Sequence, residues 1–150
     1  MDGSGNVYIA DEYNNRVLKE DFADPPSLSF ASTAMGSTSS DSPQTVTVEN
    51  VGNAALIFPI PSGGSDPSIP TNFTLNSIGA SACPLVSAGS STAGTLAAGQ
   101  SCLLPISFTP TAVGDLSGTL VLTDNAFNAV APGYATQSIP LSGAGTAGTP

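Results

Sequence analysis

Apolar and polar residues alternate in short runs between Ser27 and Gly145, and this pattern limits the possible folds more than any other feature. A period of two is typical of β-strands that bury one face. The clearest run, SCLLPISFTP, places Cys102, Leu104, Ile106 and Phe108 on one face and Leu103, Pro105 and Ser107 on the other. Shorter runs alternate at Leu28/Phe30, Val46/Val48, Leu56/Phe58/Ile60, Phe73/Leu75, Leu120/Leu122 and Ile139/Leu141. The pattern therefore predicts about seven strands.

Turn signals separate these runs, and no window sustains a helical stripe. The signals are Asn50-Val51-Gly52-Asn53, Ser62-Gly63-Gly64, Thr109-Pro110, Val113-Gly114-Asp115 and Asp124-Asn125. Many short strands joined by such turns predict an all-β fold, an immunoglobulin-like antiparallel β-sandwich of about seven strands. Pro105 lies inside a predicted strand and cannot donate to a ladder, so we expect it to face an edge, a bulge or solvent.

The charges exclude several classes of function. Arg16 and Lys19 are the only basic residues. The segment from Asp21 onward therefore contains carboxylates but no Lys or Arg that could pair with them. Nucleic acid is excluded as a partner because its binding depends on Lys and Arg, and an anionic membrane surface is disfavoured for the same reason. The most apolar stretch, AALIFPI at 54–60, is far shorter than the ~20 residues of a membrane span. With no histidine in the chain, neither a Ser-His-Asp nor a Cys-His arrangement can form.

The two cysteines, Cys83 and Cys102, bear on the compartment of the protein. The start Met1-Asp2-Gly3 lacks the basic and apolar regions of a signal peptide, so we expect a targeting segment upstream. An even cysteine count in a low-charge chain favours one disulfide, and disulfides persist in oxidising compartments. The alternative is a pair of buried free thiols that act as small hydrophobic side chains.

The segment 25–145 resembles a known family, the ASPM-SPD-2-Hydin (ASH) type of immunoglobulin-like domain, in the form found in bacterial "choice-of-anchor D" surface proteins. The resemblance is carried by LSF at 28–30, Gly36, QTVTVENVGNAAL at 44–56, NFTL at 72–75, LAAGQSCLLPISFTPTAVGDLSGTLVLTDNA at 96–126 and SIPLSGAG at 138–145. It implies a sandwich in which the cysteines are paired, and a structural role in a secreted or cell-surface protein. The loop 126–137 is longer than the family pattern, and 61–71 is unusually rich in Pro and Gly.

The opening stretch DGSGNVYIADEYNNRVLK admits three interpretations. A calcium loop of the EF-hand type needs Gly at its sixth position and Glu at its twelfth, where this chain has Val7 and Tyr13. A phosphate-binding loop needs a Lys after the glycines and a helix behind them, and neither follows. The stretch resembles an NHL repeat, with GNVYIAD as one strand, EYNN as a turn and RVLK as the next strand. We therefore expect a partial NHL repeat, a remnant of a β-propeller blade, and linker at 1–24, the sandwich at 25–145, and a tail or linker at 146–150.

Candidate polar sites are few, and each has a structural explanation. Asp11/Glu12 and Glu20/Asp21 are pairs of adjacent carboxylates. Adjacent side chains of a strand point to opposite faces, so we interpret these carboxylates as solvent-exposed surface residues. Asp124-Asn125 with Asn128 could hold a cation, but a turn built on Asx side chains explains them better. Asn72-Phe73-Thr74 is a formal glycosylation acceptor whose Phe73 we place in the core. Phe127 and Tyr134 are expected to fold down onto the sandwich with their loop.

The remaining carboxylates are expected at turns or on outward strand faces, with pKa values near 4. They are Asp24, Asp41, Glu49, Asp66, Asp115 and Asp124. A carboxylate buried without a cation would cost several kcal/mol or stay protonated.

The sequence thus predicts no catalytic, cofactor or metal site and no enzyme. The first hypothesis is a structural, spacer or adhesion module of a secreted or cell-surface multidomain bacterial protein, located extracellularly, at the cell surface or in the periplasm. Its partners would be the other domains of that protein. The alternative is a binding module that recognises a protein or polysaccharide through a sheet edge or the 126–137 loop.

Overall fold

The computed structural model describes residues 6–11, 16–21 and 26–148. The strands β1 (Asn6–Asp11) and β2 (Arg16–Asp21) pair antiparallel in a two-stranded sheet of their own. Their register runs from Asn6 opposite Asp21 to Asp11 opposite Arg16. These strands agree with the two predicted from GNVYIAD and RVLK, and the predicted EYNN turn at 12–15 lies outside the described residues.

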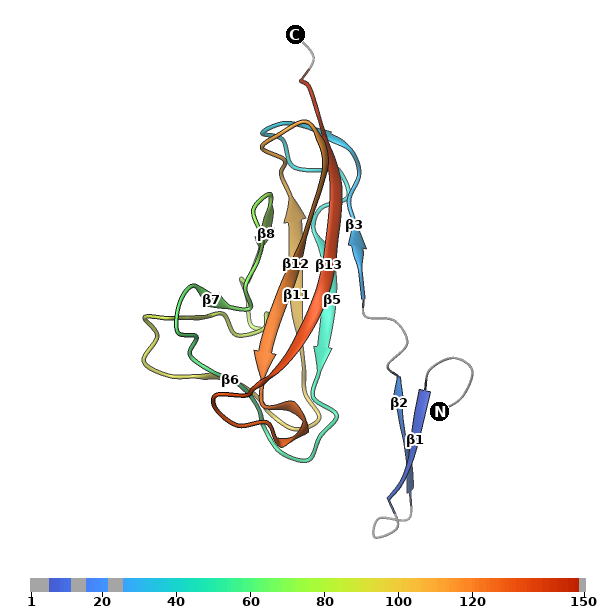
Figure 1. Cartoon of the computed structure of the whole chain (residues 1–150), viewed down its shortest axis with the longest axis vertical. Helices are drawn as coiled ribbons and strands as arrows, with labels where there is room; N and C mark the ends of the chain where they lie inside the picture. Colours follow the sequence, from blue (N-terminus) through green and yellow to red (C-terminus); the bar gives the residue numbers. More distant parts are fainter. Residues whose placement is uncertain (1–5, 12–15, 22–25, 149–150) are drawn as a thin grey trace.

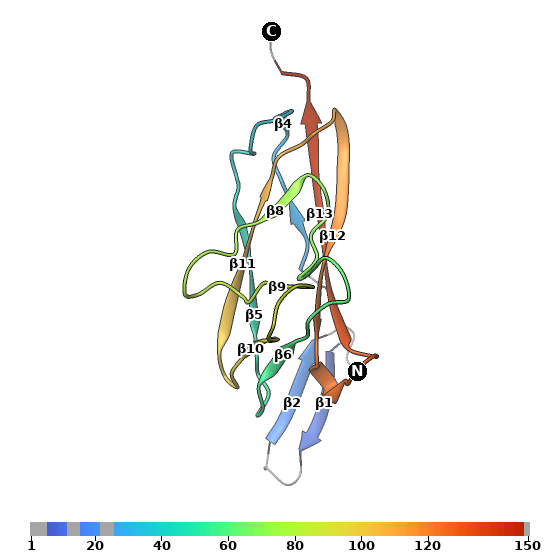
Figure 2. The same cartoon turned by 90° about the vertical axis from the view of Figure 1, so that its left-hand side faces the viewer.

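Two sheets form the sandwich (Figure 1). The first has the order β5-β11-β8, with β5 at Gln44–Glu49, β11 at Ser101–Phe108 and β8 at Phe73–Leu75. The second has the order β12-β13-β3, with β12 at Gly114–Asp124, β13 at Ala135–Thr146 and β3 at Leu28–Ser29; β4 (Thr33–Ala34) also pairs with β13. Figure 2 shows the two layers side by side, with β5 and β11 in one and β12 and β13 in the other. The predicted sandwich is confirmed.

Short strand pairs and one helical turn complete the described fold. β6 (Leu56–Phe58) pairs with β10 (Gly94–Leu96), and β7 (Ser65–Asp66) pairs with β9 (Val86–Ser87). The 3₁₀ turn η2 (Ala126–Asn128) follows β12. In the described part of the chain no helix could cross a membrane. All seven predicted strands are present, whereas β4, β7, β9 and β10, which show no alternation of apolar and polar residues, were not predicted.

The core lies between the sheets and is filled by the residues of the inward phases. Phe108 packs against Phe30 and Phe73, with ring centroids 5.8 and 5.1 Å away. Leu104, Ile106 and Leu120 are fully buried around this aromatic cluster. The alternation therefore predicted the core correctly, except at Ile60, which is 41% exposed because β6 ends at Phe58 and the chain turns away.

The ladder between β11 and β5 needs no hydrogen-bond donor from Pro105. Pro105 lies opposite Thr45 of β5, at a pair that does not exchange backbone hydrogen bonds. Its carbonyl accepts a hydrogen bond from Asn76 N–H on the other side, at 2.8 Å. The Asn76 carbonyl in turn accepts a hydrogen bond from Ile78 N–H at 2.9 Å, so it does not depend on a donor from Pro105.

Candidate functional site

The cysteines join β11, the central strand of the first sheet, to the 81–83 segment that lies beside it. Cys102 of β11 and Cys83 form a disulfide with their Cα atoms 4.8 Å apart, and both are buried. Leu103 fixes the same segment through two backbone hydrogen bonds, accepting from Cys83 N–H at 2.9 Å and donating to the Ser81 carbonyl at 2.8 Å. The structure thus contains the disulfide that the sequence favoured, and such a bond is typical of oxidising compartments.

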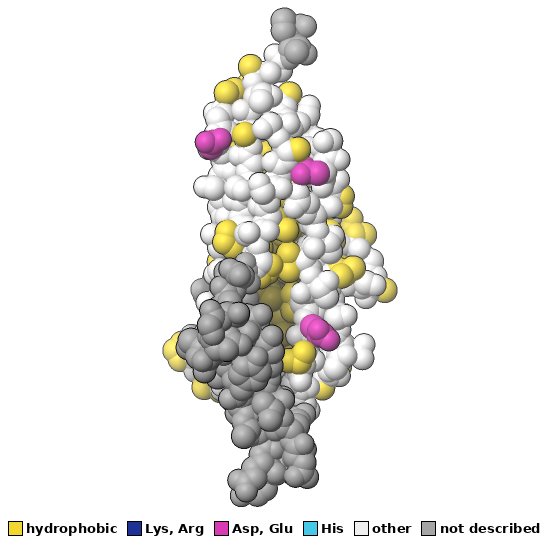
Figure 3. All heavy atoms as spheres, turned by 90° about the vertical axis from the view of Figure 1, so that its right-hand side faces the viewer, with side chains coloured by type: hydrophobic (Ala, Val, Ile, Leu, Met, Phe, Trp, Pro, Cys, Tyr) yellow, Lys and Arg dark blue, Asp and Glu magenta, His cyan; other side chains and the backbone are white. Residues whose placement is uncertain are grey.

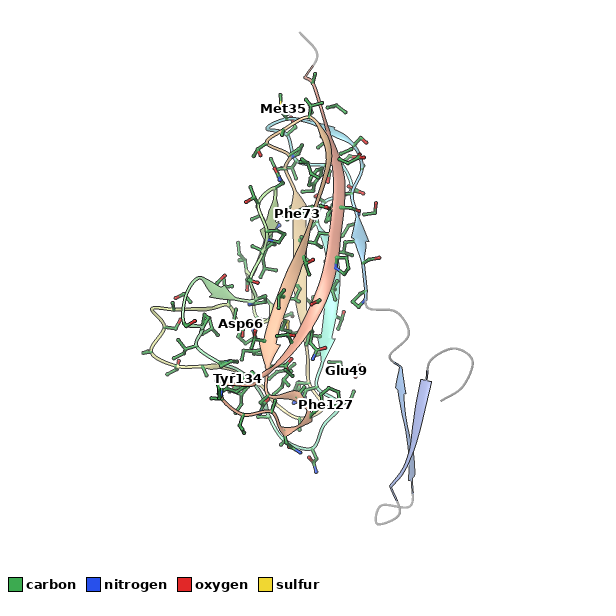
Figure 4. The ribbon with its side chains drawn as sticks, viewed as in Figure 1. Met35, Glu49, Asp66, Phe73, Phe127 and Tyr134 are labelled. Atoms are coloured by element: carbon green, nitrogen blue, oxygen red, sulfur yellow. A yellow bond between two sulfur atoms is a disulfide. The ribbon has the colours of Figure 1, made fainter. Side chains whose placement is uncertain are left out.

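Two carboxylates, Asp66 and Asp124, are buried, which corrects the expectation that all of them face solvent. Asp66 is 3% exposed and Asp124 is 2% exposed. Asp66 Oδ1 accepts a hydrogen bond from the backbone N–H of Thr123 at 2.8 Å, so its side chain substitutes for a ladder partner at the edge of β12. Asp66 Oδ2 is buried and has no hydrogen-bond partner among the described residues. Figure 4 shows Asp66 on the side of the sandwich opposite Glu49.

Asp124 closes the inward face of β12. It follows Leu120 and Leu122 at the same phase, a signal that could have revealed its burial from the sequence. Its Oδ1 accepts from Ala126 N–H at 2.8 Å, which forms an Asx turn, and Asn125 Oδ1 accepts from Ile57 N–H at 2.8 Å. The turn interpretation of this stretch is therefore correct. The described residues contain no group of three or more His, Cys, Asp or Glu that could hold a metal ion.

Burial changes the pKa values of both carboxyls. Loss of hydration raises the pKa of Asp66 to about 6; the Thr123 N–H opposes this rise and the charge of Asp124 adds to it. Burial likewise raises the pKa of Asp124, against the hydrogen bonds from Ala126 and Gln137. The expectation of values near 4 is therefore wrong for these two groups.

The other carboxylates of residues 26–148 are not buried. Asp41, Glu49 and Asp115 are exposed as expected, and Asp24 lies outside the described residues. The pKa of Asp41 is lowered, because hydrogen bonds from Ser39, Ala31 and Gln44 together outweigh its loss of hydration, which alone would raise it.

We expect the Asp66→Asn variant to be more stable than the parent at neutral pH. The folded pKa of Asp66 lies above its ordinary value of 3.8, so the folded state holds the proton more tightly than the unfolded chain. Stability from this group is therefore complete below about pH 4 and is lost as the pH rises through about 6. A shift of this size corresponds to about 2–3 kcal/mol. Asparagine keeps the acceptor for Thr123 N–H and carries no charge.

Urea unfolding followed by circular dichroism between about pH 4 and 7 measures this effect. The parent should lose stability over that range, and Asp66→Asn should flatten the profile except for the part due to Asp124. Asp115→Asn removes an exposed carboxylate on β12 and serves as the control, with a change within about 0.5 kcal/mol. A profile unaltered by Asp66→Asn would contradict the role of its burial.

An open groove of about 760 Å³ lies between β5 and β13. Its floor is apolar and is formed by Val46, Val48, Leu56, Leu122 and Ile139. Asp124, Glu49 and Gln137 also line it. Figure 3 shows hydrophobic side chains along a furrow flanked by backbone atoms and non-hydrophobic side chains. The sequence did not predict this groove, because its walls come from strands about 90 residues apart.

The 126–137 loop does not bury its aromatic residues as expected. Phe127 is 74% exposed and lines the groove, while Tyr134 is half-buried. The backbone of Phe127 has a φ of 58°, a left-handed conformation that a bulky residue adopts only at a cost. This conformation directs the chain through η2 and leaves the ring facing outward. Val130 in the same loop is also exposed.

The remaining candidate residues have structural roles or lie where only the backbone is described. Asn72 Oδ1 accepts hydrogen bonds from the N–H and Oγ1 of Thr111, at 2.9 and 2.7 Å, and so ties the start of β8 to the turn after β11. Phe73 is buried, as the sequence predicted. Asp11 ends β1, Glu20 and Asp21 end β2, and Glu12 lies outside the described residues.

Comparison with known proteins identifies a solved structure with a similar fold. No protein-family model and no curated protein matches the chain. Among solved structures, the ASH/PapD-like domain of human CEP192 (PapD-like domain 7) is 18% identical, with 84% of each chain covered and a TM-score of 0.52. The structure of the Vibrio cholerae VesB protease is 17% identical, with 80% of this chain and 30% of that chain covered and a TM-score of 0.45. The described sandwich is therefore an immunoglobulin-like module with the ASH/PapD-like fold.

Proposed function

We propose that the chain is a non-enzymatic structural module, a spacer or adhesion domain, of a secreted or cell-surface multidomain bacterial protein of the "choice-of-anchor D" kind. The observation that carries this proposal is a disulfide-linked sandwich of the ASH/PapD-like fold. The bond favours an extracellular, cell-surface or periplasmic location. In this proposal residues 25–145 are the module, residues 1–24 are a partial NHL repeat and linker, and residues 146–150 are a tail or linker.

The long ladder of the second sheet supports a spacer role. β12 and β13 are paired residue by residue from Gly114 opposite Gly145 to Asp124 opposite Ala135. This ribbon runs along the length of the sandwich, and β13 ends at Thr146, still paired with β4, at one end of the sheets (Figure 1). The core packed between the sheets resists bending, so a domain attached after β13 is held away from the sandwich.

The spacer role is tested by placing the chain between two folded marker domains and measuring the distribution of distances between them by fluorescence energy transfer. We expect a narrow distribution that does not change with ionic strength. A Gly/Ser linker with the same number of residues is the control, because it behaves as a random coil with a broad distribution. A distribution as broad as that of the linker would contradict the spacer role.

A further inference from the structure

Among the described residues, β5 has a strand partner on one side only, so its other edge is free. Asn50, which follows β5, donates its N–H to the Gln100 carbonyl at 2.9 Å, and this contact sets the phase of the ladder with β11. Since hydrogen-bonded positions alternate in an antiparallel pair, the backbone groups of Thr45, Thr47 and Glu49 face away from β11. No described residue pairs with them. The opposite edge of this sheet, β8, has only three residues, whereas β5 offers six.

The groove lies directly beside this edge. On the far wall, β3 pairs with β13 only at Leu141 and Ser142, so β13 has no described partner on that side at Gln137–Ile139. A strand added to β5 would therefore point alternate side chains between the sheets, onto Val46, Val48 and Ile139. One extended segment could therefore pair its backbone with the free edge and pack its side chains on the apolar floor.

Exposed apolar side chains mark one end of the groove. Val51 is 85% exposed and Phe127 is 74% exposed, and both line it. Figure 4 shows Phe127 and Glu49 at the same end of the sandwich, on the side of β5. Natural sheets commonly protect their edges with Lys, Pro or a bulge, and β5 carries none of these between Gln44 and Glu49.

The charge of this surface defines the chemistry of a partner. Glu49 is exposed at the groove, and residues 26–148 contain neither Lys nor Arg. A carboxylate at the edge of an added strand favours a cation at the facing position. An acidic or neutral segment would leave Glu49 unpaired.

We propose that the groove between β5 and β13 binds an extended segment of another protein, which adds as a strand to β5. Apolar side chains at alternate positions of this segment fill the groove, and a Lys or Arg on the outer face meets Glu49. Phe127 and Val51 cover one end of the segment. This binding role goes beyond the proposed structural role and does not depend on it.

A synthetic peptide of about ten residues, with Val alternating with Thr and Lys, is the probe. It is added to the full chain, and amide signals are followed by NMR with hydrogen exchange. We expect protection of the amides of Thr45, Thr47 and Glu49, whose N–H groups face the free edge. Replacing Lys by Glu in the peptide should weaken binding about fivefold. N-methylation of the central peptide residues, which removes the backbone donors, should abolish binding.

Variants of the chain locate the contact. Phe127→Ser should weaken binding about tenfold, whereas Ile78→Ser removes an equally exposed side chain away from the groove and should have no effect. Glu49→Lys should reverse the preference between the Lys and Glu peptides. Thr47→Pro removes a donor from the free edge without breaking the ladder to β11 and should abolish binding. Circular dichroism verifies folding, and Phe127→Ser and Glu49→Lys decide the matter if Thr47→Pro does not fold.

Several outcomes would overturn the proposal. One is the absence of binding at millimolar peptide, and another is binding that is insensitive to both Phe127→Ser and Glu49→Lys. Protection of the same three amides in the free chain would assign the edge to a segment of this chain or, if sedimentation shows a dimer, to a second copy. Perturbation of the groove by a neutral soluble glucan and not by the peptides would make it a polysaccharide site.

Discussion

Replacing Phe108 with alanine is expected to lower the free energy of unfolding by about 3–5 kcal/mol. Phe108 has no exposed surface and lies at the centre of an aromatic cluster with Phe30 and Phe73. Its ring also covers Gly143 of β13, where an added Cβ would lie 2.6 Å from a ring carbon. The side chain therefore joins the two sheets, and its removal leaves a cavity that the paired strands cannot close. Urea unfolding followed by circular dichroism measures the loss.

Phe127→Ala is the matched control for this prediction. It deletes the same atoms from a side chain that is 74% exposed, so we expect a change within about 0.5 kcal/mol. Losses of equal size for the two variants would show that the aromatic cluster does not hold the sheets together. A small loss for Phe108→Ala alone would mean that the core rearranges to fill the space.

Loss of the disulfide is expected to lower the free energy of unfolding by about 3 kcal/mol. The bond joins residues 19 positions apart and so restricts the unfolded chain, while in the folded state it holds the 81–83 segment beside β11. The variant Cys83→Ala with Cys102→Ala should lose this amount and, because both sulfurs are buried, a further contribution from packing. Urea unfolding measures the change.

The parent chain in reducing buffer separates the two contributions. It keeps both side chains in the core but lacks the bond, so its loss of stability reports the cross-link alone. Equal unfolding midpoints for the oxidised and reduced chains would contradict a stabilising role. The disulfide would then retain its value as an indicator of compartment but would not explain how the loop is held.

The burial of Asp66 and the exposure of Phe127 are two features that the sequence pattern does not predict. Asp66 precedes a proline in a stretch rich in Pro and Gly, which predicts a turn, yet its carboxyl receives the N–H of Thr123, 57 residues further along the chain. Phe127 was expected to pack on the sandwich, but the path of η2 turns it outward. The burial of Asp66 depends on a partner that is distant in sequence, so no local pattern could reveal it.

The sequence by itself determined the strands and the faces that they bury, because successive side chains of a strand point to opposite sides whatever the strand packs against. Cys102, Leu104, Ile106 and Phe108 are buried for that reason, whereas the number and setting of the cysteines only favoured the disulfide that the structure contains. Only the tertiary structure decided which edges stay free. The groove beside β5 exists because β3 covers β13 at Leu141 and Ser142 and not at Gln137–Ile139, and strand pairing between distant segments is set by the global packing of the two sheets.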